Sequence, residues 1–186
     1  MYYHASSIGE IAVLEPRISN HQTPLVYFSQ KRENVLVYLS NAVEKFCKEN
    51  GFQYAGIWQK WASYGFDKDG IQHISEYYPD ALVDTYKGVS GFIYSVERVD
   101  DCGFQTKIPF AAASEKPVKV SACEHVSDAY QEILLAEKRG LIRITRYNQI
   151  TEKMREWIFR SVREEYKNAG NHPEYRFFLE GKFGSF

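Results

Sequence analysis

Residues 25–38 read LVYFSQKRENVLVY, and this stretch decides the fold that we expect. Leu25–Ser29 is an apolar run of strand length. Lys31–Lys48 then places apolar residues at helical spacing on one face, and Gly51 follows as a stop signal, so we predict one amphipathic helix. Tyr27 and Tyr38 are 38 − 27 = 11 positions apart, so a strand end plus three helical turns would bring both rings near one cleft.

The rest of the chain alternates between short strands and separate helices. We predict strands at Tyr2–Ala5, Ile11–Glu15, Gln53–Trp58, Phe92–Glu97, Val118–Ala122 and Leu141–Tyr147. We predict helices from a Ser127 cap to Arg139, from a Thr151 cap with Met154, Trp157, Ile158 and Val162 buried, and over Pro173–Lys182. Without regular alternation, this pattern favours an α+β fold. We expect one domain over 1–186, with an aromatic-rich insertion at about 59–90 and C-terminal helices at about 151–183.

Composition narrows the possible partners. Aromatic residues make up 16% of the 186 residues, and Tyr combines a large apolar ring with a polar end that can reach a ligand. The formal charge of −1 argues against nucleic acid or an anionic membrane as an obligate partner. No apolar stretch approaches the ~18 residues that a bilayer requires, and the N-terminus does not resemble a signal peptide.

The cysteines and histidines give no metal or disulfide pattern. Cys47, Cys102 and Cys123 lie far apart with no Cys-x-x-Cys pair, which is typical of a reducing cytoplasm. The five His residues show no ligand spacing, so we expect no metal. Dinucleotide-fold and P-loop glycine motifs are absent from the sequence. We therefore expect a cytoplasmic protein whose site depends on other residues.

Three short motifs resemble the NAD-binding half of the ADP-ribosyltransferase superfamily, in its His-Tyr-Glu branch. These are His4-Ala5-Ser6, then Val26-Tyr27-Phe28-Ser29, then Tyr38, in that order. The resemblance covers about the first 45 residues. It implies a core of two small, mostly antiparallel sheets around a cleft that binds NAD as a substrate.

The resemblance also implies roles for individual residues. His4 would hydrogen-bond the adenosine ribose, Ser6 would face the nicotinamide amide or a ribose, and Tyr27 and Tyr38 would clamp nicotinamide. Two positions depart from the family: Ala5 replaces a common Gly, and Val35 stands where a Ser often binds the carboxamide. Core packing is the alternative for both tyrosines, and an ordinary strand position is the alternative for His4.

Cleavage of the nicotinamide–ribose bond also requires an acid. Its transition state resembles an oxocarbenium ion, which a nearby carboxylate stabilises. In the family a Glu begins a late strand, and Glu115 directly precedes the alternating segment Val118–Ala122. We rank Glu115 first, Glu124 second and Glu97 third. A solvated surface position is the alternative for each.

The resemblance therefore predicts NAD-dependent transfer of ADP-ribose to an unknown acceptor, possibly a protein, or hydrolysis of NAD. Its main alternative is a catalytically inactive domain of the same fold that binds a nucleotide or a protein. A module unrelated to NAD, with Tyr27 and Tyr38 in its core, is the third possibility.

Overall fold

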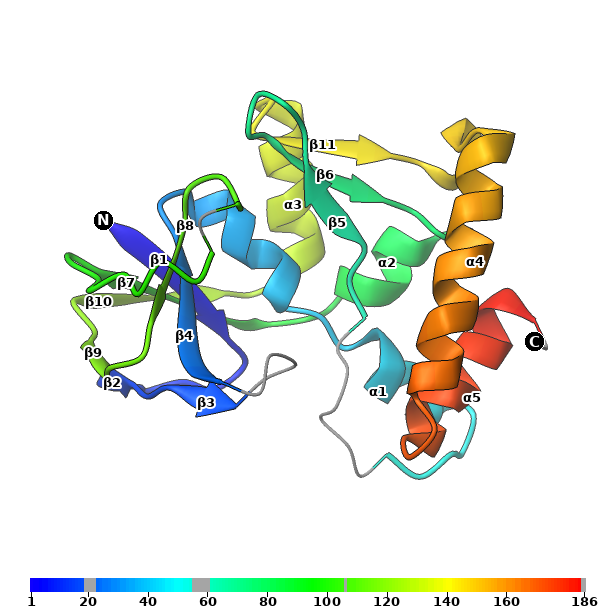
Figure 1. Cartoon of the computed structure of the whole chain (residues 1–186), viewed down its shortest axis with the longest axis horizontal. Helices are drawn as coiled ribbons and strands as arrows, with labels where there is room; N and C mark the ends of the chain where they lie inside the picture. Colours follow the sequence, from blue (N-terminus) through cyan, green and yellow to red (C-terminus); the bar gives the residue numbers. More distant parts are fainter. Residues whose placement is uncertain (19–22, 55–60, 106, 185–186) are drawn as a thin grey trace.

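The computed structural model describes residues 1–18, 23–54, 61–105 and 107–184, and it shows an α+β fold (Figure 1). The strands are β1 (Tyr2–Ser6), β2 (Val13–Leu14), β3 (Arg17–Ile18), β4 (Pro24–Ser29), β5 (Tyr64–Phe66), β6 (Gln72–Ser75), β7 (Gly91–Val96), β8 (Ala111–Ser114), β9 (Val118–Lys119), β10 (Ala122–Val126) and β11 (Ile142–Thr145). The helices are α1 (Ala42–Glu49), α2 (Ala81–Tyr86), α3 (Ala129–Lys138), α4 (Glu152–Asn168) and α5 (Pro173–Phe183), with 3-10 turns η1 (Arg32–Tyr38) and η2 (Tyr147–Gln149).

The largest sheet is antiparallel and has β1 in its interior. Its order is β10-β7-β1-β4-β3, and β8 pairs with β4 as well. Five residue pairs join β1 to β7, from Tyr2 opposite Val96 to Ser6 opposite Phe92. By contrast, only Tyr3 and Ser29 are paired between β1 and β4. The two strands therefore diverge after one residue pair, and a gap opens between them.

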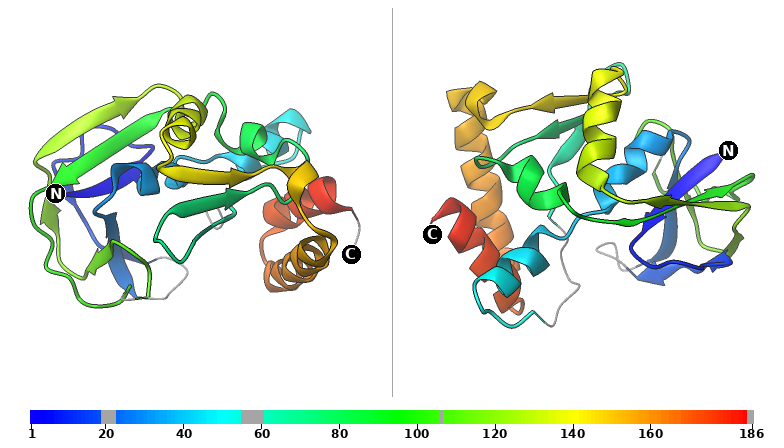
Figure 2. Two further views of the ribbon diagram at one scale, coloured as in Figure 1. Left: turned by 90° about the horizontal axis from the view of Figure 1, so that it is seen from above. Right: turned by 180° about the vertical axis from the view of Figure 1, so that it is seen from behind.

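Two smaller sheets complete the strands. In one, β6 pairs in parallel with β11 and antiparallel with β5, so the 59–90 segment is joined to the chain that precedes α4. In the other, β2 pairs with β9. Figure 2 shows that β6 and β11 lie beside each other and that α4 and α5 are at the end of the molecule remote from β1.

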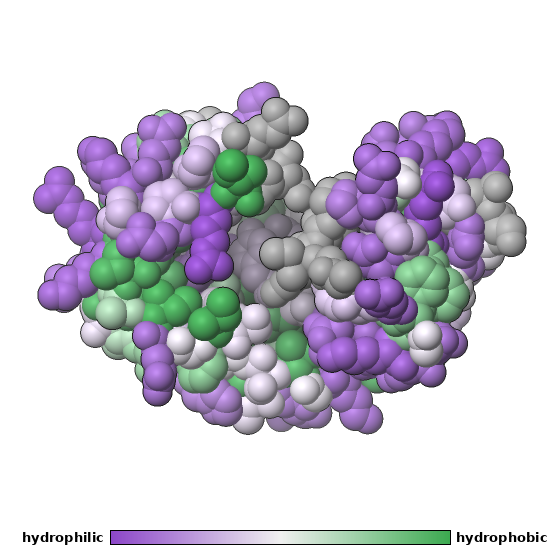
Figure 3. All heavy atoms as spheres, turned by 90° about the horizontal axis from the view of Figure 1, so that it is seen from below, coloured by the Kyte–Doolittle hydropathy of each residue, from purple (hydrophilic) through white to green (hydrophobic). Residues whose placement is uncertain are grey.

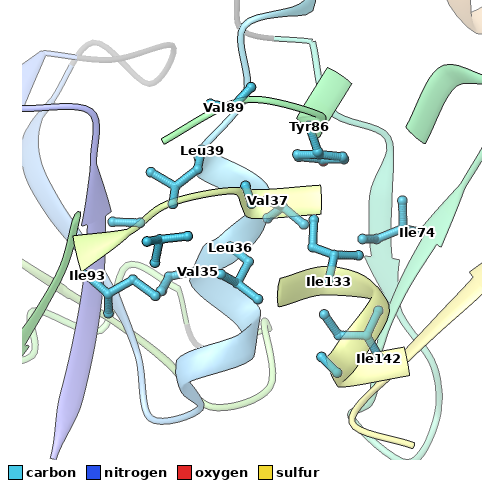
Figure 4. Close-up of a cluster of buried hydrophobic side chains, with 14 of the residues drawn as sticks. Val35, Leu36, Val37, Leu39, Ile74, Tyr86, Val89, Ile93, Ile133 and Ile142 are labelled. Carbon is cyan, nitrogen blue, oxygen red and sulfur yellow. The ribbon is translucent and has the colours of Figure 1, made fainter. Parts of the chain in front are cut away.

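Each face of the large sheet packs on its own core. On one face, Phe28 and Tyr94 pack with Leu14 and Val118 from the two-stranded sheet. On the other face, Ile93 packs on η1. Figure 4 shows Val35, Leu36 and Val37 of η1 between Ile93 on one side and Ile133 of α3 on the other. A third core joins α1, α4 and α5, and Trp61 and Tyr78 of the 59–90 segment are buried in it.

The single helix predicted over Lys31–Lys48 is wrong. The structure has η1, then a break at Leu39 (φ −86°, ψ 72°), then α1. Four consecutive residues of η1, Asn34–Val37, are buried, so the buried positions are not confined to one face as they are in an amphipathic helix. The predicted end is right, because α1 stops at Glu49 and Gly51 has φ +65°.

Other predicted boundaries differ in detail. Val118–Ala122 is divided between β9 and β10, and the cap of α3 is Asp128, whose carboxylate accepts from the N–H groups of Tyr130 and Gln131. Thr151 does cap α4, but the prediction that Trp157 is buried is wrong: it is 44% exposed and packs edge to face on Tyr77 at the border of the third core.

The predicted strand at Gln53–Trp58 lies only partly within the described residues. Gln53 and Tyr54 are not in a strand, and Ala55–Trp58 lie outside the described residues. No helix in the described ranges combines the length and apolar character needed to cross a membrane.

Candidate functional site

His4 bridges the gap between the diverging strands. Its Nδ1 lies 2.9 Å from the carbonyl oxygen of Tyr27 in β4. A carbonyl only accepts hydrogen bonds, so Nδ1 carries the proton and Nε2 of the neutral ring is an acceptor. Burial lowers the pKa of His4 below its ordinary 6.5, and the nearby Arg17 cation lowers it further, against the opposing effect of the Tyr27 carbonyl. His4 is therefore a neutral imidazole at pH 7.

The pairing of β4 with β8 explains why the Tyr27 carbonyl faces His4. Tyr27 lies opposite Ala113, whose N–H donates to Asp101 and whose carbonyl accepts from Cys102. Ala113 thus directs its backbone groups away from β4. Tyr27 and Ala113 therefore form a non-hydrogen-bonded pair, in which each residue points its N–H and C=O away from the other strand. The N–H and C=O of Tyr27 thus point toward β1.

A cavity of about 170 Å³ opens beside this contact. His4, Ser6, Tyr27, Arg17 and Glu15 supply polar groups to its lining, and the remaining lining residues are Ile8, Ile11, Val13, Leu14, Leu25 and Val26. A cavity of roughly 150 Å³ holds one aromatic ring. The cavity therefore fits one ring system.

Tyr27 and Tyr38 lie near each other on the η1 side of the sheet. The neighbours of Tyr27 in β4, Val26 and Phe28, belong to the core on the other face, so alternation turns Tyr27 toward η1. Burial raises the pKa of Tyr38, and the neighbouring Tyr64 and Tyr27 hydroxyls raise it further. The Tyr64 hydroxyl donates to that of Tyr38 at 3.1 Å, and the two rings meet edge to face at 5.9 Å.

The aromatic group formed by Tyr27, Tyr38 and Tyr64 is partly open to solvent. Tyr38 is 40% exposed and Tyr64 is 37% exposed, which excludes core packing for Tyr38. The elements that carry them, η1 and β5, lie between the large sheet and α4 in Figure 1, and Figure 3 shows the molecule hollowed between its two ends. Val35 is 1% exposed and packs in the core, so it faces no ligand.

The three predicted acids do not line the His4 cavity. Glu115 is exposed in the turn between β8 and β9. Glu97 follows β7 and lines a different, open cavity of about 720 Å³ with Arg98 and Lys116.

Glu124 is engaged by an arginine. Arg32 of η1 donates to both of its oxygens, at 2.9 and 2.5 Å, and lies 3.0 Å from Glu132 in α3. These contacts make the Glu124 carboxylate part of a structural ion-pair network. The hydrogen bonds from Arg32 also lower the pKa of Glu124.

Arg17 and Glu15 were missed in the sequence. One signal could have found Arg17, because it is the only Lys or Arg within the first 30 residues. Pairing of β3 with β4, with Arg17 opposite Leu25, brings it to the cavity. Glu15 is the carboxylate that the described lining contains. Together with His4 and Ser6, these side chains offer a cation, two hydrogen-bonding groups and an acid.

Comparison of the chain with protein-family models, with curated proteins and with solved structures finds no match. Among the residues that the structure describes, no group of three or more His, Cys, Asp or Glu side chains is placed to hold a metal ion. The site is therefore interpreted from its own chemistry.

Proposed function

We propose that this chain is an ADP-ribosyltransferase-like domain that binds NAD in the gap between β1 and β4 and transfers ADP-ribose to an acceptor or to water. The observation that carries the proposal is the bond from His4 to the Tyr27 carbonyl, across two strands that diverge, with Arg17 beside it. That bond leaves Nε2 of His4 as an acceptor for a ribose hydroxyl.

His4 and the two tyrosines lie on opposite faces of the large sheet, so an extended dinucleotide would meet both groups by passing between β1 and β4 beyond their one paired position. His4 packs against Phe28 at 5.9 Å between ring centroids, whereas Tyr27 and Tyr38 lie on the η1 side. The adenosine end would meet His4, Arg17 would pair with the pyrophosphate, and the nicotinamide ring would lie against the tyrosines. The cavity of about 170 Å³ would enclose one ring system of the ligand, with the rest lying along the surface.

Glu115 is our predicted catalytic carboxylate, with Glu124 second. Glu15 lines the cavity that would hold the adenosine end, so it would contact the adenosine ribose and not the nicotinamide–ribose bond. The exposed turn position of Glu115 and the ion pairs of Glu124 favour the alternative function, a domain that binds a nucleotide without catalysis.

A first experiment tests binding alone. NAD at ~100 times its dissociation constant should stabilise the folded protein by ~2.7 kcal/mol, which thermal unfolding detects. Arg17→Gln should weaken binding about tenfold or more, because a charge-assisted bond to phosphate is lost. Arg139→Gln is the matched control, since Arg139 is an exposed arginine at the end of α3. No stabilisation by NAD would refute the proposal.

A second experiment tests the chemistry. Nicotinamide release from NAD should be measured for wild type, Glu115→Gln and Glu124→Gln, with Glu15→Gln as a control at the adenosine end. Loss of release in one variant with NAD affinity retained would identify the acid, since a carboxylate that acts in the transition state contributes little to ground-state binding. Binding without release in the wild type would favour the non-catalytic alternative.

A further inference from the structure

A pocket of about 400 Å³, which we call the α4 pocket, lies at the end of the molecule that carries α4 and α5 (Figure 1). Its walls are residues 77–79 before α2, η2 with the first turns of α4, and the end of α5. It shares no lining residue with the His4 cavity. Its volume falls within the range of small-molecule sites, roughly 300–1,000 Å³. The lining residues are Tyr77, Tyr78, Pro79, Tyr147, Glu152, Arg155, Glu156, Ile158, Phe159, Lys182 and Phe183.

The buried carboxylate of Glu76 holds two of these walls together. One of its oxygens accepts from the N–H of Leu82 in α2, and the other accepts from the N–H of Tyr147 in η2, both at 3.0 Å. Tyr77 and Tyr78 follow Glu76 directly, and the rings of both pack on Trp61. The aromatic wall and η2 are therefore fixed relative to each other, which lowers the ordering cost of binding a ligand.

The lining is rich in aromatic rings, because five of its residues are Tyr or Phe. A cation above the face of such a ring is attracted by its negative face. One of the protein's own cations shows this in the pocket, since the Arg155 guanidinium lies 5.2 Å from the centroid of the Tyr147 ring. Tyr77 and Phe183 have no cation over their rings in the described part of the chain, so a ligand could supply one.

Two carboxylates of the pocket are without a cation partner. Glu152 and Glu156 lie one turn apart on the same face of α4, and neither forms an ion pair with another described residue. The two cations of the lining are both engaged, because Lys182 bonds the carboxylate of Asp84 and Arg155 lies over an aromatic ring. The pocket therefore combines aromatic surface with uncompensated negative charge, and this combination favours an organic cation.

We propose that the α4 pocket binds a small quaternary ammonium compound. Its positive head would lie against the aromatic rings, and the exposed carboxylates of Glu152 and Glu156 would balance its charge. A quaternary ammonium has no N–H group to satisfy, whereas a primary ammonium would need acceptors for three. This site goes beyond the proposed NAD site and does not depend on it.

Choline and its uncharged analogue of the same shape, 3,3-dimethyl-1-butanol, test the proposal in the full chain. Titration of isotope-labelled protein with choline should shift the amide NMR resonances of Glu156 and Phe159. The dissociation constant of choline should be about tenfold lower than that of the alcohol, because only choline gains from the rings and the carboxylates. Added salt should weaken choline binding, since exposed charges are screened.

Matched variants separate the charge from the rings. Glu152→Gln combined with Glu156→Gln keeps the shape of both side chains, so it should raise the dissociation constant of choline about tenfold and leave that of the alcohol unchanged. Phe183→Leu keeps apolar surface but removes a ring, so it should weaken choline binding about two- to fivefold. Glu49→Gln should change neither constant, because Glu49 is an exposed residue of α1 outside the pocket.

Four results would overturn the proposal. Equal affinity for choline and the alcohol would indicate an apolar pocket with no preference for a cation. Unchanged choline affinity in the double glutamine variant would remove the role of the carboxylates. Shifts confined to Tyr38 and Tyr64 would place choline on the other aromatic group. No shift at Glu156 and Phe159 would exclude the pocket. The comparison of the two probes on the wild type decides the outcome even if a variant folds poorly.

Discussion

Replacing His4 by Phe should weaken both the fold and NAD binding, by amounts that the structure allows us to work out. Phe keeps a ring against Phe28, where the centroids are 5.9 Å apart, but it removes both ring nitrogens. The Tyr27 carbonyl then loses the donor that lies 2.9 Å away, at a point where β1 and β4 make no ladder pair. Loss of a donor to a buried acceptor costs about 1–3 kcal/mol.

A midrange loss of ~2 kcal/mol should lower the Tm by about 4–8 °C in a domain of this size. Urea unfolding measures the free energy, and calorimetric titration measures NAD affinity, which should fall about tenfold with the lost acceptor at Nε2. His125→Phe is the control, because His125 is an exposed histidine in β10. If His4→Phe matched the control in both assays, the argument for His4 would be wrong.

The pH dependence provides an independent check. The pKa of His4 is lower in the folded protein than its ordinary 6.5, so the unfolded chain binds more protons in this range. Stability should therefore fall as the pH decreases from about 6.5 through the folded-state pKa of His4. The difference in unfolding free energy between wild type and His4→Phe should shrink over this interval. A constant difference would show that His4 does not titrate in this way.

Two further substitutions test the packing of the structure. Gly181→Ala places a Cβ 2.7 Å from Cε1 of Phe46, so overpacking of about 1–3 kcal/mol should exceed the gain of ~1 kcal/mol in helix propensity. Urea unfolding should show a net loss of unfolding free energy, which Phe46→Leu should restore. Glu76→Ala removes a buried carboxylate that accepts from the N–H groups of Leu82 and Tyr147, both at 3.0 Å. The free energy of unfolding, measured with urea, should therefore fall by about 3–5 kcal/mol, and a loss below ~1 kcal/mol would contradict this role.

Much of the secondary structure was predictable because its signals are local. The apolar run at Leu25–Ser29 and the alternation at Phe92–Glu97 predicted the strands β4 (Pro24–Ser29) and β7 (Gly91–Val96), and Thr151 caps α4 through its bond with the N–H of Met154. The break at Leu39 was not predictable in this way. It follows from packing of η1 between the large sheet and α3, which no pattern within residues 31–48 reveals.

The residues of the candidate site also fall into those indicated by local motifs and those brought in by long-range packing. Short motifs pointed to His4, Ser6 and Tyr27; the structure brings His4 and Ser6 to one cavity, whereas the ring of Tyr27 turns to the η1 side and its carbonyl meets His4. Arg17 arrives there through pairing of β3 with β4, and Tyr64 reaches Tyr38 from a segment 26 positions away. Both contacts are set by long-range pairing and sheet packing, so spacing within a motif could not predict them.

The pairing of β1 with β7 constrains the order in which the chain can fold during translation. Tyr2 lies opposite Val96, so β1 remains without this partner until a strand 94 residues later in the chain has been synthesised. At about 5–20 residues per second, that wait lasts on the order of 5–20 s. Until then, Tyr3 and Ser29 are its one ladder contact. A nascent chain arrested before residue 91 would carry His4 and Tyr27 but would lack the strand that fixes β1 beside them.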